Sequence, residues 1–253
     1  VDEAHFIKNP SAARSKNVRN IAKKSDILLF MTGTALENHV DEMISLMEVL
    51  QPNIARAASQ MAFLGTAPQF REKIAPVYYR RKRENVLKEL PECIENIEWC
   101  TMTPQEEEAY EKTLYAKNYM AIRRLSWNVE DKSYLVFSFF LDTIEAVYKL
   151  LGRKCVNPIN GKLTPQRRQE ILDEFEKAPA GTVLPAQIQS GGTGLNIQAA
   201  SVVIICEPQY KPSIEKQAIA RAHRMGQARN VLVYRLMCEN SIDERILEIL
   251  EAK

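Results

Sequence analysis

Histidines, glycines and long apolar runs are scarce in this sequence. Three histidines among 253 residues argue against a histidine-based metal cluster, and nine glycines with twelve prolines are too few for a collagen-like or low-complexity chain. The five cysteines are odd in number and form no C-x-x-C pair, so neither a disulfide framework nor a zinc knuckle is indicated. The longest apolar stretches, 27–31 and 202–206, are far shorter than the roughly 18 residues of a membrane-spanning helix. The sequence therefore predicts a folded protein of a reducing compartment, without a membrane-spanning segment.

Composition and charge set the class of protein but leave its function open. Hydrophobic residues make up 45% and charged residues 26%, which are globular averages, and the length suits one large or two ordinary domains. The net charge is only +2, yet residues 216–238 hold five basic side chains and no acidic one, and 80–83 are all basic. Residues 91–108 show the reverse, with six glutamates and no base. Basic stretches can hold phosphates, but most are solvated surfaces, so charge alone does not decide the function.

Residues 131–253 have the hydrophobic pattern of an α/β domain. Apolar runs rich in β-branched residues predict strands at 134–139, 201–206 and 230–236. Amphipathic stretches between them predict helices, whose start and stop signals are Gly152, Thr164, Pro212 and Ser241. Strands that are apolar on both faces and separated by helices indicate a mostly parallel sheet covered on both sides.

Residues 1–130 contain fewer regular elements. A strand is predicted at 26–31, and a helix from about residue 38 with an inward face of Val40, Met43, Ile44, Met47 and Leu50. A long helix is predicted from Thr103 to about Trp127, with Pro104 in its first turn. The polar stretch 128–133 marks a boundary. We therefore expect three parts: residues 1–100, a helical connector at 101–130, and residues 131–253.

Asp2-Glu3-Ala4-His5 is a short match to a motif of nucleotide hydrolases. In such enzymes a carboxylate at the end of a strand holds the magnesium ion that bridges two phosphates, and the next acid orients or deprotonates the attacking water. The alternative is the acidic start of a helix, where Asp and Glu are common. Four residues recur often by chance, so the motif alone does not separate these interpretations.

Two segments of small residues are candidate ligand loops. Thr32-Gly33-Thr34 follows the strand predicted at 26–31 and would lie at a carboxyl end of the sheet, where α/β proteins bind ligands. The loop 189–196 has three glycines in four positions, which lets backbone N–H groups approach a phosphate chain. Ordinary structural turns explain both segments equally well.

Gln217, Arg221 and Arg224 are spaced i, i+4 and i+7. This spacing places them on one face of the helix that is predicted to begin at Pro212. Two arginines on one face suit the charge that develops on a transferred phosphoryl group, because guanidinium is planar, always charged and bidentate. The alternative is an exposed basic stripe.

Together these segments resemble the Swi/Snf branch of the superfamily 2 helicase-like ATPases. The matching motifs follow the family's order: DEAHFIKN at 2–9, TGTALEN at 32–38, Arg80-Arg81 before Leu90-Pro91, GGTGLN at 191–196, and QAIARAHRMGQ at 217–227. The resemblance covers nearly the whole chain. It implies a RecA-like α/β fold with two lobes that close on ATP and Mg²⁺, and a DNA-dependent ATP hydrolase that moves along double-stranded DNA.

The resemblance also implies roles for individual residues. Asp2 would carry the magnesium ion, Glu3 would be the hydrolytic base, and Arg221 and Arg224 would be arginine fingers. Gln217 and His5 would couple the lobes. The other implied contacts are with the nucleotide, from Asp2, His5, Gly192, Gly194 and Asn196, and with DNA, from Thr32, Gly33, Thr34 and Thr193.

Two departures from the family pattern concern the extent of the chain. The family's phosphate-binding loop, G-x-x-x-x-G-K-[ST], has no match in the sequence, so we expect a fragment with a partial first lobe that does not hydrolyse ATP alone. The stretch 127–133 is shorter than the helical segment that this family usually has there.

Two other functions were weighed against the resemblance. A non-catalytic DNA- or protein-docking module would keep the fold, but the intact Asp2, Glu3, Arg221 and Arg224 argue against it. A dinucleotide-binding enzyme is disfavoured because no G-x-G-x-x-G follows a strand. The resemblance further implies a monomer that binds double-stranded DNA, either DNA alone or DNA that is part of a protein complex. Its location would be the cytoplasm, at the nucleoid, in a prokaryote and the nucleus in a eukaryote.

Overall fold

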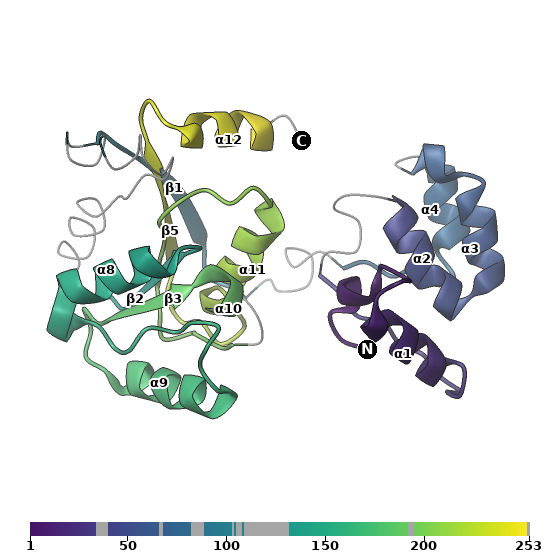
Figure 1. Ribbon diagram of the computed structural model, residues 1–253, viewed down its shortest axis with the longest axis horizontal. Coiled ribbons are helices and arrows are strands. Elements are labelled where there is room, and N and C mark those ends of the chain that lie inside the picture. The colour runs from purple at the N-terminus through teal and green to yellow at the C-terminus, as the bar shows by residue number, and fades with distance from the viewer. Residues whose placement is uncertain are drawn as a thin grey trace. The chain divides into compact units, whose positions relative to one another are not determined.

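The chain divides between Val86 and Leu87 into two units, each described here by itself (Figure 1). The computed structural model describes residues 1–33, 40–65, 68–81, 89–102, 104, 108, 132–191 and 195–251. Strand β1 (Cys93–Cys100) belongs to the sheet of the second unit. The first of the three expected parts, 1–100, therefore ends beyond this division, and its identity as a lobe stays a prediction.

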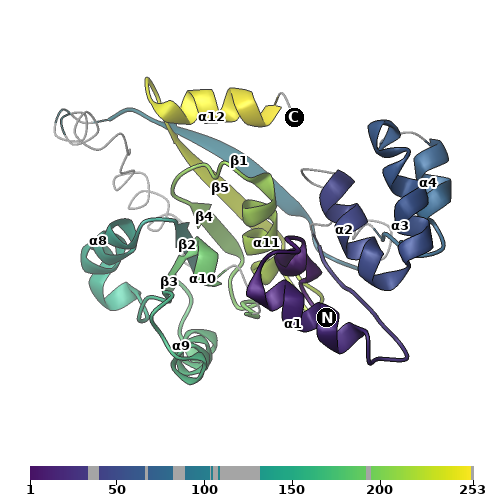
Figure 2. The ribbon, with the colours of Figure 1, turned by 45° about the vertical axis from the view of Figure 1, so that its right-hand side comes forward.

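The second unit is built on one sheet of five parallel strands (Figure 2). The strand order is β1, β5 (Val231–Cys238), β4 (Val202–Ile205), β2 (Tyr134–Ser138) and β3 (Val183–Gln187). The apolar runs predicted as strands are confirmed as β2, β4 and β5. Every residue of β2 and β4 is buried, because each of these strands has a neighbour on both sides and helices on both faces.

Helices cover both faces of this sheet. Leu135 and Phe137 of β2 pack on the face of α9 (Pro165–Lys177) and α11 (Pro212–Ala222). Tyr134 and Val136 pack on the opposite face with α8 (Leu141–Leu151), because successive side chains of a strand point to opposite faces. Helix α8 follows β2 and α11 follows the neighbouring β4, so the chain leaves these two strands toward opposite faces. In open α/β sheets, ligands bind beside the carboxyl ends of such a strand pair.

The start and stop signals predicted for the helices of the second unit lie at helix ends in the structure. Helix α8 is followed by Gly152, whose φ of 52° suits glycine, and by the 3-10 helix η3 (Gly152–Lys154). Thr164 caps α9, since its Oγ1 accepts the Arg167 N–H at 3.2 Å. Two further helices are α10 (Ile188–Gly191) and α12 (Ile242–Glu251).

The capping of α12 differs slightly from the predicted pattern. Ser241 Oγ accepts the N–H of Asp243 at 3.1 Å, and Glu244 Oε1 accepts the N–H of Asn240 at 2.8 Å. In a standard capping box the partners are the N–H groups of Glu244 and Ser241. Both hydrogen bonds are therefore shifted by one residue toward the N-terminus, and the helix still begins directly after Ser241.

The first unit is helical in its described residues. Its elements are η1 (Ala4–Ile7), α1 (Ala13–Ala22), α2 (Val40–Leu50), α3 (Pro52–Ser59), η2 (Ala62–Leu64) and α4 (Pro68–Ile74). Helix α2 confirms the predicted helix, and its Met43, Ile44 and Met47 are buried in one cluster with Phe70 of α4. No helix in the described ranges combines the length and the apolar character needed to cross a lipid bilayer.

The strand predicted at 26–31 is wrong. This segment is extended but belongs to no sheet, and the side chains of Ile27 and Leu29 are 89% and 66% exposed. The described residues of the first unit form no sheet, so no neighbouring strands cover these apolar side chains. The long helix predicted at 103–127 lies outside the described residues, except that positions 104 and 108 are helical.

Candidate functional site

The Asp2–His5 motif lies beside the extended segment 29–32. The Met31 N–H donates to Val1 O at 2.9 Å, and Met31 O accepts the Ala4 N–H at 2.9 Å. Between these two contacts, the segment 1–4 has one residue more than a regular β-ladder would have, as in a β-bulge. The additional residue is accommodated at Glu3, whose φ of 48° lies in the left-handed region. Constrained backbone of this kind clusters at functional sites.

This backbone arrangement brings two of the predicted motifs into contact. His5 Nδ1 lies 3.1 Å from Thr32 Oγ1 and 3.2 Å from Glu3 Oε2. The hydrogen bond with Thr32 joins the acidic motif to the Thr32-Gly33-Thr34 segment, of which Gly33 is exposed and Thr34 lies outside the described residues.

The two carboxylates of the motif are suited to a magnesium ion that also binds phosphates. Asp2 is exposed, and its Oδ1 accepts the N–H of Glu3 at 2.8 Å. Glu3 Oε2 is buried and lies 3.2 Å from His5 Nδ1. Mg²⁺ prefers oxygen ligands and usually takes one or two carboxylates together with substrate phosphates. The described residues hold no group of three or more His, Cys, Asp or Glu arranged for a metal, and a nucleotide-bound Mg²⁺ does not need one.

In the second unit, α11 lies next to the end of the glycine-rich loop. The Ile197 N–H donates to Arg221 O at 3.0 Å, which attaches the residue after Asn196 to the last turn of the helix. Gln217 and Arg221 are half-buried, whereas Asn196 is exposed. Gly192, Thr193 and Gly194 lie outside the described residues. The structure thus brings Asn196 and Arg221 close together although 25 positions separate them in the sequence.

The helical face predicted for the arginines is wrong at Arg224. Helix α11 ends at Ala222, and His223 has φ −85° and ψ 79°, which are not helical values. Arg224 is therefore exposed in the turn after the helix. The Gln227 N–H donates to Arg224 O at 2.9 Å, and Gly226 has a φ of 97°, so the chain turns toward β5 where a helix would have continued.

Gln227 holds this turn in place and is a residue that sequence reasoning did not single out. Its Nε2 lies 3.0 Å from the carbonyl oxygens of Gln198 and Ala200, and 3.1 Å from that of Ala222. Its Oε1 accepts the N–H of Arg229 at 3.1 Å. One buried amide thus joins the loop before β4, the end of α11 and the start of β5. The only signal in the sequence is its place as the last residue of QAIARAHRMGQ.

The basic tract 216–238 does not form one surface. Arg235 Nε donates to Glu215 Oε2 at 2.7 Å, and Arg235 Nη2 lies 2.8 Å from Glu95 Oε2. Burial lowers the pKa of Arg235, but its two carboxylate partners raise it, and the net change is an increase. Arg235 is therefore an internal ion-pair partner, whereas Arg224 and Arg229 are exposed.

Glu207 lies at the carboxyl ends of β2 and β4, where the chain leaves toward opposite faces. Ser138 Oγ lies 3.0 Å from both of its carboxylate oxygens, and the Phe139 N–H donates to Oε1. Burial raises the pKa of Glu207 to about 8, although the hydrogen bonds from Phe139 and Ser138 lower it. The group therefore changes its charge close to neutral pH. Nothing in the sequence pattern indicated this, because Glu207 follows a predicted strand as an ordinary loop acid would.

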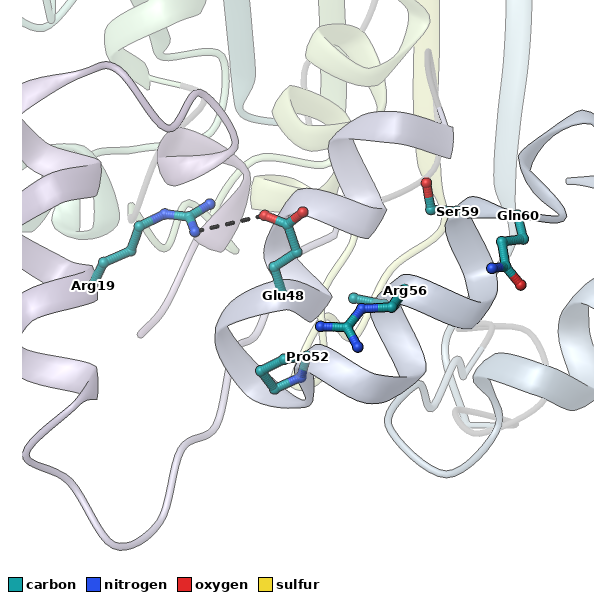
Figure 3. A pocket seen from close by; sticks show the side chains of 7 residues that line it. Arg19, Glu48, Pro52, Arg56, Ser59 and Gln60 are labelled. Atoms are coloured by element: carbon teal, nitrogen blue, oxygen red, sulfur yellow. Dashed lines mark ion pairs between the residues drawn. The ribbon is translucent and has the colours of Figure 1, made fainter.

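An open pocket in the first unit lies apart from these motifs (Figure 3). Its volume is about 520 Å³, and it is lined by Arg19, Glu48, Pro52, Ala55, Arg56, Ser59 and Gln60. Arg19 Nη2 donates to Ser45 O and Ser45 Oγ, both at 3.0 Å, and Arg19 Nη1 lies 3.8 Å from Glu48 Oε2. The guanidinium is thus held by neighbouring protein groups, and no predicted site residue lines the pocket.

The parallel sheet with helices on both faces defines a RecA-like α/β protein, as the resemblance implied. Residues 1–145 match the model of the SNF2-related domain, and residues 117–226 match that of the helicase conserved C-terminal domain. The chain belongs to the SNF2-related family.

Individual relatives agree with this assignment. An uncharacterized ATP-dependent helicase of Mycoplasma genitalium is 27% identical over the whole chain and 29% of its own length. The ATP-dependent helicase fft1 and the chromatin remodeling factor mit1 of Schizosaccharomyces pombe are 24% and 25% identical, again over the whole chain. The chain spans 38% and 23% of these two proteins.

A solved structure supports the fold. The Sulfolobus solfataricus SWI2/SNF2 ATPase core in complex with dsDNA has a TM-score of 0.50 and 23% identity to the chain. The match covers the whole chain and 66% of that structure's chain.

Proposed function

We propose that this chain is part of an ATP-dependent double-stranded DNA translocase, in which ATP hydrolysis drives movement on DNA or remodelling of protein–DNA complexes. The observation that carries the proposal is the 3.1 Å contact between His5 Nδ1 and Thr32 Oγ1. It joins carboxylates suited to a magnesium-bound nucleotide to a segment that the resemblance assigns to DNA. The relatives named as ATP-dependent helicases and as a chromatin remodeling factor support the same reading.

In this proposal the chain's own residues have distinct tasks. Asp2 holds Mg²⁺, which when bound neutralises phosphate charge. Glu3 accepts the proton of the attacking water, and its buried Oε2 lies 3.2 Å from His5 Nδ1. Arg221 and Arg224 stabilise charge on the transferred phosphoryl group. The remaining nucleotide contacts come from His5, Gln217, Gly192, Gly194 and Asn196, and the DNA contacts from Thr32, Gly33, Thr34 and Thr193.

The proposed setting follows from the same resemblance. The partner is double-stranded DNA, alone or in a protein complex, and the protein acts as a monomer. The nucleoid of a prokaryote or the nucleus of a eukaryote would contain such DNA.

Thr32→Val tests whether the contact with His5 couples the two motifs. In the longer ATP-hydrolysing protein that would contain this chain, we expect DNA-stimulated turnover to fall about fivefold, because one net hydrogen bond is worth roughly 1 kcal/mol. The affinity for ATP should change little, since valine has nearly the same shape as threonine. Steady-state ATPase assays with and without duplex DNA give both quantities.

Ser25→Ala is the matched control for Thr32→Val. Ser25 Oγ donates to Ile21 O at 3.1 Å, in the same unit but outside the motifs, so its loss should leave turnover unchanged. Equal DNA stimulation in Thr32→Val and the wild type would disprove the coupling. A longer protein that shows no DNA-stimulated hydrolysis at all would disprove the proposed function.

Duplex DNA should bind to the chain with strong salt dependence and no sequence preference. A translocase must bind every sequence, so its contacts should go to phosphates and not to base edges. With three phosphate contacts, affinity should fall about 40-fold when salt rises fourfold. Fluorescence anisotropy with two unrelated duplexes at two salt concentrations measures both properties. A strong preference for one duplex would favour a dedicated DNA-binding module.

A further inference from the structure

Helix α11 is attached at both of its ends to one segment of chain. This leading segment, residues 90–95, follows the division between the units and runs into β1. At the C-terminal end of the helix, His223 Nε2 lies 2.7 Å from Pro91 O. At the N-terminal end, Arg235 bridges Glu215 of α11 and Glu95 of β1. The helix that carries Arg221 is therefore placed against the leading segment twice.

The His223 contact lies where the helix stops and the turn toward β5 begins. A carbonyl oxygen only accepts hydrogen bonds, so Nε2 carries the hydrogen and donates it to Pro91 O. His223 is the residue between Ala222, where the helix ends, and Arg224. The two residues before His223 are also held by hydrogen bonds. The Ile197 N–H, just after the glycine-rich loop, donates to Arg221 O, and Gln227 Nε2, in the turn, donates to Ala222 O. Both contacts help to fix the position of His223.

The ionic contact near the other end of the helix involves a buried carboxylate. Glu215 is only 5% exposed, and its two oxygens accept from the Gln209 N–H at 2.8 Å and from Arg235 Nε at 2.7 Å. Removing Arg235 would leave a buried charge without its counter-ion, which is strongly unfavourable. Ion pairs thus join the start of α11 to β5 and, through Glu95, to β1.

We propose that His223 is a positioning residue that couples the leading segment to Arg221 and Arg224. A displacement of the leading segment moves Pro91 O and with it the end of α11 and the turn that carries Arg224. The leading segment thus helps to place the arginines. Only the meaning of this coupling for catalysis rests on the proposed function, since the contacts themselves lie within the second unit.

Hydrogen exchange of the 253-residue chain tests the coupling without any nucleotide. In His223→Ala, we expect amides of residues 223–228 and of Glu92 and Cys93 to exchange about fivefold faster, as the loss of one hydrogen bond of roughly 1 kcal/mol allows. His223→Gln should restore wild-type exchange, because its amide nitrogen is as many bonds from Cα as imidazole Nε2. His223→Asn should fail to restore it, because its amide nitrogen is one bond closer to Cα.

Asn230→Ala is the matched control at the same segment. Asn230 Oδ1 accepts the Glu92 N–H at 3.2 Å but belongs to the loop before β5 and not to α11. This variant should accelerate exchange near Glu92 while the turn 223–228 keeps its protection. Unchanged exchange in β2 and β4 shows that no variant destabilises the unit as a whole.

Three results would overturn the coupling. In the first, the turn of His223→Ala exchanges as in the wild type. In the second, His223→Gln and His223→Ala have the same exchange rates. In the third, Asn230→Ala also loses protection in the turn. If His223→Ala does not fold, the comparison of Gln with Asn still decides, and Glu95→Gln probes the ionic contact at a half-exposed carboxylate.

The catalytic consequence is measured in the longer protein. His223→Ala should lower kcat by about 10- to 100-fold with little change in KM for ATP, because small misplacements of a catalytic group have effects of this size. His223→Gln should recover most of kcat. If exchange behaves as expected while the longer protein shows no DNA-stimulated ATP hydrolysis, the coupling stands and the proposed function fails.

Discussion

Replacing Arg221 with alanine in the longer protein is expected to lower kcat for ATP by about 10³- to 10⁵-fold. An arginine finger acts mainly when charge develops on the γ-phosphoryl group, so turnover should fall far more than nucleotide affinity. Arg221→Lys should not rescue, because an ammonium keeps the charge but loses the planar, bidentate fork. DNA-stimulated ATPase assays and ATP titrations separate the two quantities.

Arg224→Ala should have an effect of the same order, although Arg224 lies in the turn after α11. Lys216→Ala is the control, because Lys216 is an exposed base on the same helix, and its removal should leave kcat within about threefold. If both arginine variants also stay within threefold of the wild type, the finger assignment is wrong. The basic residues would then be a solvated or DNA-facing surface.

The second unit should lose stability as pH rises from about 4.5 to about 8. Burial raises the pKa of Glu207 from its ordinary value of 4.5 to about 8, so the folded state binds a proton that the unfolded state releases in this interval. The contribution of this bound proton to the free energy of unfolding is fully present below pH 4.5 and is lost as the pH rises through about 8. The shift corresponds to a decrease of up to about 5 kcal/mol in the free energy of unfolding.

Urea unfolding at pH 5 and pH 8.5 measures this change for the second unit alone. Both tryptophans, Trp99 and Trp127, follow residue 86, so their fluorescence reports only that unit. Glu207→Gln should abolish most of the pH dependence, because an amide accepts the hydrogen bonds from Ser138 and Phe139 without titrating. Asp243 also has a pKa raised by burial and leaves a smaller decrease of the same sign at lower pH. A Glu207→Gln protein with the full wild-type slope would contradict the assignment.

Local signals were sufficient for the central elements of the second unit. The apolar runs that became β2 and β4 are buried on both faces and the run that became β5 is mostly buried, and such strands are recognisable without knowledge of their neighbours. Thr164 and Gly152 act at helix ends, where the deciding contacts lie within a few residues. The family motifs were also readable, because each is a short run of consecutive residues.

Elements at the margins depended on partners that are distant in the sequence. The segment 93–100 carries two glutamates and is a strand only because β5 pairs with it along its whole length. The segment 26–31 has the apolar character of a buried strand, but no sheet in the described residues of the first unit accepts it. Hydrophobic pattern therefore predicted burial correctly where neighbours exist and incorrectly where they do not.

The candidate site divides in the same way. Spacing placed Gln217 and Arg221 on one helix, and the structure agrees because helical geometry is local. The exit of Arg224 from that helix depends on Gly226 and on contacts with residues near Gln198. Three contacts join groups that are 69 to 140 positions apart in the sequence. They are the pairs Arg235–Glu95, Ser138–Glu207 and His223–Pro91. Sequence spacing carries no information on such pairs, because they form only when the tertiary fold brings distant segments together.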